Sequence, residues 1–208
     1  MIDGHIWLAA LWAIFGAVHS LLAAEWLKKR AQSLMGSGFR FYRLAYSTFF
    51  TLFLTAIVIF MTAITTFWLW KPGAPLILLS AILTLAGIAA MTVCIRKYFF
   101  YLSGFDVFLK KKERPKTLER GGLHRFVRHP LYAATLFAMW SLLLAVPTMS
   151  YLTTCLMITF YTVAGIIPEE HKLKREFGWE YERYRRETPM LIPFLKLGKM
   201  KAEESPGR

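Results

Sequence analysis

The sequence predicts an all-α polytopic membrane protein of about five transmembrane helices, followed by a cytoplasmic amphipathic helix near the C-terminus. Hydrophobic residues make up 56% and aromatic residues 16% of its 208 residues, and the mean hydropathy is +0.40. A soluble domain of this size cannot bury so much apolar side chain, whereas a bilayer solvates it. The composition therefore favours an integral membrane protein over a soluble one.

Five apolar stretches approach the roughly 17 to 25 residues that a helix needs to cross about 30 Å of hydrocarbon. They are 5–24, 44–69, 75–95, 131–146 and 149–167. The last two are short and only residues 147–150 separate them, so we expect a tight hairpin. The first stretch has Asp3 rather than Lys or Arg before it, which predicts a retained span rather than a cleaved signal peptide.

The positive charge alternates with the predicted spans. The formal net charge is +13, and 25 of the 26 Lys and Arg residues fall in the segments 25–43, 96–130 and 168–208. Because basic loops stay cytoplasmic, this pattern predicts a bacterial or archaeal inner-membrane protein with its N-terminus outside and its C-terminus inside. Orientation and contact with anionic membrane lipids account for the charge, so we expect no nucleic-acid partner.

We expect a single integral membrane domain over residues 1–208. In its three-span half, residues 1–95, the spans themselves contain few polar side chains. Residues 96–195 hold almost all of the side chains capable of chemistry, and 196–208 have the composition of a flexible tail. Any active region is therefore expected at the cytoplasmic side.

The segment after the last span has the features of a helix start. Pro168 fits a first helical position, and Glu169 and Glu170 would meet the positive end of the helix dipole. Apolar and aromatic side chains then recur at helical spacing, namely Leu173, Phe177, Tyr181 and Tyr184. The pattern predicts an amphipathic helix over 168–187 at the membrane surface.

Two clusters of ionisable residues flank the predicted hairpin. Residues 122–132 read Gly-Leu-His-Arg-Phe-Val-Arg-His-Pro-Leu-Tyr, and Glu169 and Glu170 follow the last span. Charged groups beside apolar spans cost several kcal/mol unless they are paired or solvated, which makes them functional candidates. From charge and position alone, Arg128 and His129 are equally compatible with interfacial anchors, and the glutamates with ordinary N-terminal helix residues.

Together the two clusters resemble the membrane-embedded methyltransferases. This superfamily contains isoprenylcysteine carboxyl methyltransferases, phospholipid methyltransferases and related bacterial thiol methyltransferases. The resemblance covers about residues 115–194 and rests on 122–132, on Glu-Glu-x-x-Leu-x-x-x-Phe-Gly-x-x-Tyr-x-x-Tyr from Glu169, and on Pro-Met-Leu-Ile-Pro from Pro189. It implies S-adenosylmethionine as the methyl donor, S-adenosylhomocysteine as its product, and a lipophilic acceptor or a small thiol, amine or carboxylate.

The resemblance also implies the residues that bind the cofactor. They are Lys116, Thr117, Leu118, Glu119, His124, His129, Pro130, Leu131, Tyr132, Glu169 and Glu170. A zwitterionic sulfonium ligand needs a cationic donor for its carboxylate and an anion for its amine, which these residues and Arg128 can supply. Methyl transfer mainly needs alignment of the reactants and exclusion of water, so no general base is assigned. The catalytic candidates are His124 and Arg128. Glu169 or solvent are further candidates for accepting a proton from the substrate.

Three positions depart from the patterns of these relatives. His124 stands where many have tyrosine, Ala134 where they have glycine, and Gly165 where the prenylcysteine enzymes have arginine. The last change leaves a carboxylate substrate without its partner, which favours a lipid amine, a small thiol or another hydrophobic acceptor. A shorter resemblance at residues 19–23 and 42–46 links the N-terminal half to bacterial thiol methyltransferases and to a related family connected with nitrogen-oxide metabolism.

Two other classes stay open. Membrane sterol reductases share an Arg-His-Pro-x-Tyr segment and would use NADPH, although the Glu-Glu-x-x-Leu-x-x-x-Phe-Gly spacing favours a methyltransferase. A non-enzymatic haem or metal protein would need His19, His124 or His129 as ligands, but the sequence has no paired-ligand spacing, so no metal is expected. His19 and Ser20 inside the first span form either a hydrogen-bonded polar pair between helices or a ligand or proton-transfer pair.

Overall fold

The computed structural model of the chain describes residues 2–103 and 117–195. Its elements in chain order are α1 (Ile2–Ala23), α2 (Glu25–Met35), the 3-10 helix η1 (Gly36–Phe41), α3 (Tyr42–Ala63), α4 (Ala74–Ser103), the 3-10 helix η2 (Gly122–Arg125), α6 (Pro130–Leu143), α7 (Met149–Phe177) and α8 (Trp179–Glu187). The described chain contains no strand beyond one isolated bridge, between Trp68 and Thr148. The predicted all-α class is confirmed.

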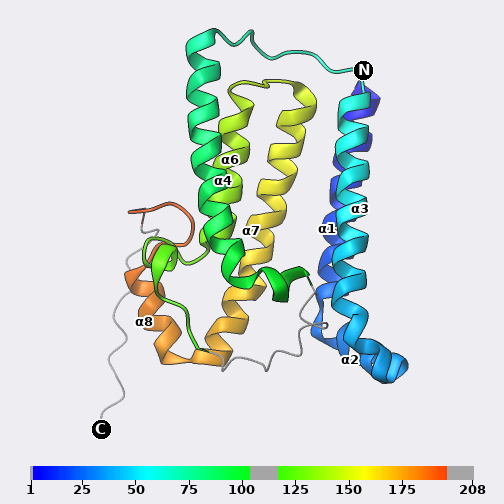
Figure 1. Cartoon of the computed structure of the whole chain (residues 1–208), viewed down its shortest axis with the longest axis vertical. Coiled ribbons are helices and arrows are strands. Elements are labelled where there is room, and N and C mark those ends of the chain that lie inside the picture. The colour runs from blue at the N-terminus through cyan, green and yellow to red at the C-terminus, as the bar shows by residue number, and fades with distance from the viewer. Residues whose placement is uncertain (1, 104–116, 196–208) are drawn as a thin grey trace.

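The long helices form one bundle (Figure 1). Helix α1 packs against α3 and α7, and α4 packs along α6. Helices α2 and α8, together with η2, lie at one end, whereas the N-terminus and the α6–α7 turn lie at the other. The start of α6, the end of α7 and all of α8 therefore meet at the same end of the bundle.

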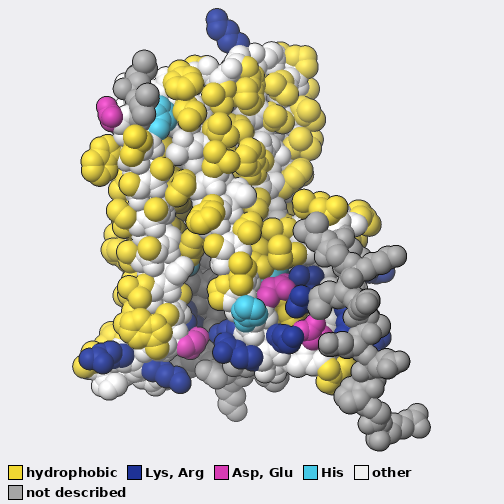
Figure 2. All heavy atoms as spheres, turned by 180° about the vertical axis from the view of Figure 1, so that it is seen from behind, with side chains coloured by type: hydrophobic (Ala, Val, Ile, Leu, Met, Phe, Trp, Pro, Cys, Tyr) yellow, Lys and Arg dark blue, Asp and Glu magenta, His cyan; other side chains and the backbone are white. Residues whose placement is uncertain are grey.

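The bundle has the dimensions and surface of a membrane protein. Four described helical segments are long and apolar enough to cross a membrane, namely Asp3–Ala23, Glu25–Ala63, Ala74–Arg96 and Met149–Phe177. Helix α6 has 14 residues and spans only about 21 Å. Hydrophobic side chains cover most of the length of the bundle, and Lys and Arg gather mainly at one end (Figure 2). The integral membrane class is supported, and the orientation of the termini stays a prediction.

Small residues allow α4 and α6 to approach closely. A Cβ atom added at Gly87 of α4 would lie 2.7 Å from Ala138 Cβ and 2.9 Å from the backbone of Ala138. Farther along the same contact, Ser80 Oγ of α4 donates a hydrogen bond to the Ser141 carbonyl of α6 at 2.7 Å. Interhelical hydrogen bonds and close backbone packing are the forces available to helices in lipid, so these contacts fix α6 against α4.

A second contact fixes α7 against α1. The small core between the helices contains Leu8, Trp12 and Ile57. The Trp12 indole Nε1 donates to Thr154 Oγ1 at 3.1 Å, which joins the two helices through a buried polar pair. Because α6 is held by α4 and α7 by α1, the ends of the predicted hairpin are positioned from both sides.

The predicted span 44–69 is too long. Helix α3 ends at Ala63, and Ile64 is extended with ψ of 142°. The chain beyond it runs beside the α6–α7 turn, where Leu69 N donates to the Pro147 carbonyl at 2.7 Å. The backbone there finds its hydrogen-bond partners in the turn, so continued helix is not required.

The predicted helix start at Pro168 is wrong. Pro168 lies inside α7, which continues to Phe177, so the last span is long rather than short. Helix-interior prolines are tolerated in membrane helices because neighbouring groups satisfy the freed backbone. The helix ends instead at Gly178, whose φ of 53° suits glycine. The predicted surface helix 168–187 is therefore two segments, the end of α7 and α8.

Candidate active site

The two sequence clusters meet around the carboxylate of Glu170. Arg128 Nε donates to Glu170 Oε1 at 2.7 Å, and His129 Nε2 lies 3.1 Å from the same oxygen. The Tyr181 hydroxyl of α8 donates to it at 2.9 Å. The Arg128 and Glu170 side chains are only 9% and 14% exposed. Glu170 is therefore a nearly buried anion whose Oε1 already has three partners.

The turn before α6 explains why Arg128 and His129 point into this site. Pro130 occupies the first turn of α6, and a proline disfavours the helical conformation in the residue before it. The backbone N–H groups of Arg128 and His129 consequently donate to the carbonyls of Pro189 and Met190, at 2.9 and 3.2 Å. The segment after α8 is thus paired with the entrance of α6.

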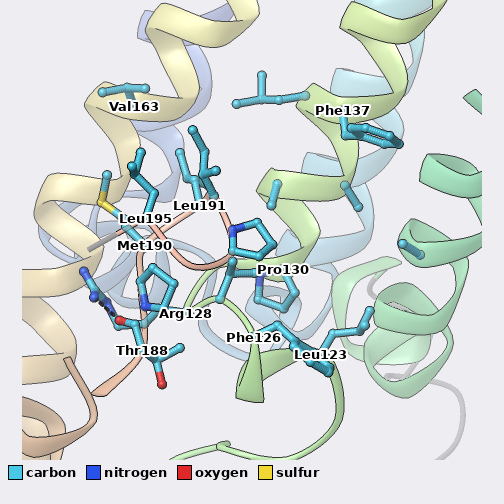
Figure 3. Close-up of a pocket in the computed structure, with 18 of the residues that line it drawn as sticks. Leu123, Phe126, Arg128, Pro130, Phe137, Val163, Thr188, Met190, Leu191 and Leu195 are labelled. Carbon is cyan, nitrogen blue, oxygen red and sulfur yellow. Dashed lines mark hydrogen bonds between the residues drawn. The ribbon is translucent and has the colours of Figure 1, made fainter. Parts of the chain in front are cut away.

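Arg128 joins three parts of the chain. Besides its ion pair with α7, its Nη1 donates to the carbonyls of Thr188 at 2.6 Å and Arg185 at 3.2 Å. Figure 3 shows the bond to Thr188 at the edge of a cavity. Several charge-assisted hydrogen bonds hold this guanidinium in one position, so its main contribution here is to fix α8 and the following segment.

Glu169 is bound very differently from its neighbour. The Tyr132 hydroxyl of α6 donates to Glu169 Oε2 at 2.9 Å, and His129 Nδ1 lies 3.9 Å from that oxygen. The Glu169 side chain is 42% exposed. A carboxylate that is held by one phenol and still reaches solvent can accept further donors, which Glu170 Oε1 cannot do.

His124 lies in η2 and is connected to α8. Its Nδ1 is 3.2 Å from the Arg128 carbonyl, and its own carbonyl accepts a hydrogen bond from the Tyr184 hydroxyl at 2.6 Å. Burial raises the pKa of Tyr184 to about 12. Arg120 Nη2 lies 3.1 Å from Glu180 Oε1, which adds an ion pair between the same two segments.

The remaining predicted cofactor residues lie around this cluster. Lys116 is outside the described residues, Thr117 is exposed, and Leu118 and Glu119 are half-buried in the segment before η2. The Glu119 carboxylate accepts a hydrogen bond from Gly121 N at 3.2 Å. At the start of α6, Pro130 is buried and Leu131 is half-buried.

A large cavity adjoins the cluster. Its volume is about 1750 Å³, and helices α4, α6 and α7 and the segment after α8 line it. Most of the lining is apolar; Arg128, Glu170 and Arg185 are among its polar members. In Figure 3, Leu123, Phe126 and Pro130 lie on one side and Met190, Leu191 and Leu195 on another. The cavity is suited to an apolar ligand with a polar group at the cluster.

Sequence reasoning missed several members of this site. Tyr181 was expected on an apolar stripe at the membrane surface, yet it is 1% exposed and bonds to Glu170. Arg185 and Thr188 carried no signal, since they contact Arg128 through backbone carbonyls. Among the described residues, no three His, Cys, Asp or Glu side chains lie where they could hold a metal ion.

Comparison with known proteins gives several relatives with the same name. The chain is 29% identical over 143 residues to a methanethiol S-methyltransferase of Crocosphaera subtropica, covering 62% of this chain and 55% of that protein. It is 27% identical over 201 residues to methanethiol S-methyltransferase 1 of Bradyrhizobium diazoefficiens, covering 89% and 66%. A second protein of that organism, methanethiol S-methyltransferase 2, is 41% identical over 75 residues, covering 35% and 27%. The chain thus spans less than two thirds of the length of these relatives.

No solved structure matches the chain. The relatives confirm the predicted resemblance to the thiol-methyltransferase-like membrane superfamily. A family model described as NnrU protein matches residues 7–196, which include every described element of the bundle from the first turns of α1 to the segment after α8. The chain therefore belongs to the NnrU protein family.

Proposed function

We propose that this protein is an S-adenosylmethionine-dependent membrane methyltransferase whose acceptor is a small thiol. The names of its relatives supply the reaction class, S-methylation of methanethiol. The observation that carries the proposal is the meeting of both sequence motifs in one site. Arg128, His129 and Glu170 form its buried part, and Tyr132 and Glu169 form its accessible part.

The residues fit the chemistry of the donor. S-adenosylmethionine has an ammonium, a carboxylate and a sulfonium, and it supplies an activated methyl group when bound. Glu169 is accessible and can accept the ammonium, because Tyr132 occupies only one of its oxygens. Arg185 lines the cavity and can donate to a carboxylate. Glu170 acts by holding Arg128 and His129 in place.

The apolar surroundings of the cluster admit an uncharged acceptor more readily than a charged one. The cavity beside Glu170 is lined mainly by apolar side chains, including Phe126, Phe137 and Trp140. An uncharged thiol enters such a lining readily, whereas a free carboxylate would need a cationic partner. Gly165 provides no such partner on α7. We place the reaction at the charged end of the bundle, which the distribution of Lys and Arg predicts to be cytoplasmic.

Ligand binding by the purified protein tests the proposal. We would add S-adenosylhomocysteine, S-adenosylmethionine or NADPH to the protein in detergent and measure heat of binding and the thermal unfolding midpoint. A ligand that binds only the folded state raises that midpoint. The proposal expects both adenosyl ligands to bind and NADPH not to bind. Binding of NADPH alone would favour the reductase class instead.

A further inference from the structure

A polar pair inside the bundle lies outside the cluster described above. The Tyr161 hydroxyl of α7 is 2.6 Å from His19 Nδ1 of α1. Ser20 Oγ donates to the same hydroxyl oxygen at 3.4 Å. When the Tyr161 hydroxyl is the donor to His19, Nδ1 is the acceptor and the second ring nitrogen carries the hydrogen.

Aromatic rings surround the His19 imidazole. Phe15 stacks on it with centroids 5.9 Å apart, and Phe50 of α3 meets it edge-on at 4.7 Å. Tyr46 and Tyr161 contact it from α3 and α7 at 5.2 and 5.8 Å. The imidazole is therefore held in place by rings from three helices, α1, α3 and α7.

Gly16, which has no side chain, leaves room for the Tyr161 ring beside His19. A Cβ atom at Gly16 of α1 would lie 2.7 Å from Tyr161 Cδ2. No Cβ atom can occupy that space while the tyrosine stays where it is. Gly16 therefore permits the Tyr161 ring to lie directly against α1, within hydrogen-bond distance of His19.

The same tyrosine shares a face of α7 with the accessible glutamate. Tyr161, Gly165 and Glu169 are four residues apart, so they follow one another along one side of the helix. A Cβ atom at Gly165 would meet nothing within 4 Å, so there is open space between the two polar side chains. Tyr132 interacts electrostatically with both Glu169 and Tyr161, which places its phenol beside this face.

We propose that Tyr161 and His19 remove the proton of the acceptor thiol, and that at this step the thiol lies in the open space beside Gly165 rather than in the cavity beside Glu170. The proposal rests on the proposed function. The thiol proton moves to the Tyr161 oxygen while the Tyr161 proton moves to His19 Nδ1. A sulfur lone pair forms the new S–CH₃ bond, and the electron pair of the broken bond stays on the sulfur of the sulfonium donor. His19 later releases its extra proton to water.

The reaction benefits from such a proton acceptor. Thiolate, not thiol, is the nucleophile, and a thiol with an ordinary pKa near 8.5 is mostly protonated at neutral pH. Among the described residues, two titratable side chains place their rings against His19, namely Tyr46 of α3 and Tyr161 of α7. Ser20 is exposed near the end of α1, the end at which we expect the proton to leave.

The test compares Tyr161→Phe and His19→Gln with wild type. Tyr161→Phe keeps the ring against His19 and removes only the hydroxyl, so it remains informative should His19→Gln fail to fold. Tyr151→Phe is the matched control, because it removes another phenol from α7, one that donates to the Met139 carbonyl at 3.2 Å. All folded variants should bind S-adenosylhomocysteine with wild-type affinity.

Two measurements are needed. The first is kcat/KM for methanethiol as a function of pH. We expect a loss of about a hundredfold at neutral pH in both variants, shrinking as pH rises and the thiol ionises in solution. The second is the ultraviolet absorbance of thiolate when methanethiol is added to protein holding S-adenosylhomocysteine. Wild type and Tyr151→Phe should show it, and Tyr161→Phe should not.

A loss of rate that is equal at every pH, or thiolate absorbance that Tyr161→Phe retains, would overturn the inference. Failure of the proposed function is distinguishable from this outcome. It would appear as the absence of methylated product from the wild-type protein itself, whatever the variants do.

Discussion

Arg128 Nε lies 2.7 Å from Glu170 Oε1, although 42 residues separate the two along the chain. The pair joins the entrance of α6 to the end of α7, and both side chains are nearly buried. Removing one partner of a buried ion pair leaves the other charge uncompensated, which is far more costly than the pair is stabilising. The pair is thus the point at which the stability of the site is most easily tested.

Glu170→Gln should destabilise the protein strongly. It keeps the shape of the side chain but leaves Arg128 and His129 without their anion, and we expect a loss of roughly 3–5 kcal/mol. The thermal unfolding midpoint in detergent measures the effect. Glu187→Gln is the control, because its pair with Arg183 is solvent-exposed and contributes about 0–1 kcal/mol. Equal midpoints for the two variants would contradict a structural role for Glu170.

Glu169→Ala should behave in the opposite way. The side chain is accessible, so the unfolding midpoint should stay near that of wild type. The affinity for S-adenosylhomocysteine should fall by more than tenfold, or about 1.4 kcal/mol, because the ligand ammonium loses its anion. Titration calorimetry measures this. His5→Ala is the control, since His5 contacts Thr66 near the start of α1. Unchanged affinity in Glu169→Ala would remove Glu169 from the site.

Gly87→Ala should weaken the contact between α4 and α6. The added methyl group would overlap the backbone of Ala138, and relieving such overpacking costs about 1–3 kcal/mol. Gly165→Ala is the matched control for stability, because its Cβ atom enters open space and alanine favours the helix. The unfolding midpoint should therefore fall in the first variant and not in the second. Equal midpoints for the two variants would contradict a close contact at Gly87, because Gly165 lies on α7 outside the contact between α4 and α6.

Alkaline pH should destabilise the contact between η2 and α8. Burial raises the pKa of Tyr184 to about 12, whereas an unfolded tyrosine ionises near pH 10. The unfolded chain therefore loses this proton first, so the stability is fully present below about pH 10 and is lost as pH rises toward 12. At pH 8 the free energy of unfolding of Tyr184→Phe should be ~1 kcal/mol below that of wild type, because the variant lacks the hydrogen bond from the hydroxyl to the His124 carbonyl.

The same variant should then lose less stability than wild type as the pH rises. Unfolding midpoints measured at pH 8 and at pH 11 make this comparison. A wild-type midpoint that falls no further than that of Tyr184→Phe would show that the buried phenol does not titrate with unfolding.

The meeting of the two motifs could be predicted from the sequence in physical terms. Residues 131–146 and 149–167 are apolar and nearly contiguous, so a hairpin in a membrane must return its second arm to the side where the first began. His129 before the first arm and Glu170 after the second are consequently forced together, and they lie 3.1 Å apart. Apolar length and order along the chain thus bring the two clusters to the same end of the hairpin.

Other features had no signal of this kind. Proline at 168 predicts a helix start because it favours a first helical position, but α7 continues through Pro168 and ends before Gly178, whose φ is 53°. Arg128 recognises the Thr188 carbonyl, a group that every residue has. The helical spacing of Tyr181 predicts that it lies on an apolar, membrane-facing stripe. Its hydrogen bond to Glu170, which the spacing does not reveal, places it in the site instead.

Product formation tests the central claim most directly. Purified protein in a lipid bilayer would receive methanethiol and S-adenosylmethionine with an isotopically labelled methyl group, and the gas above the sample would be analysed for labelled dimethyl sulfide. We predict labelled product that depends on protein and on both substrates and that Glu169→Ala reduces. A thiol acceptor would be contradicted if folded wild-type protein bound S-adenosylhomocysteine but formed no labelled dimethyl sulfide.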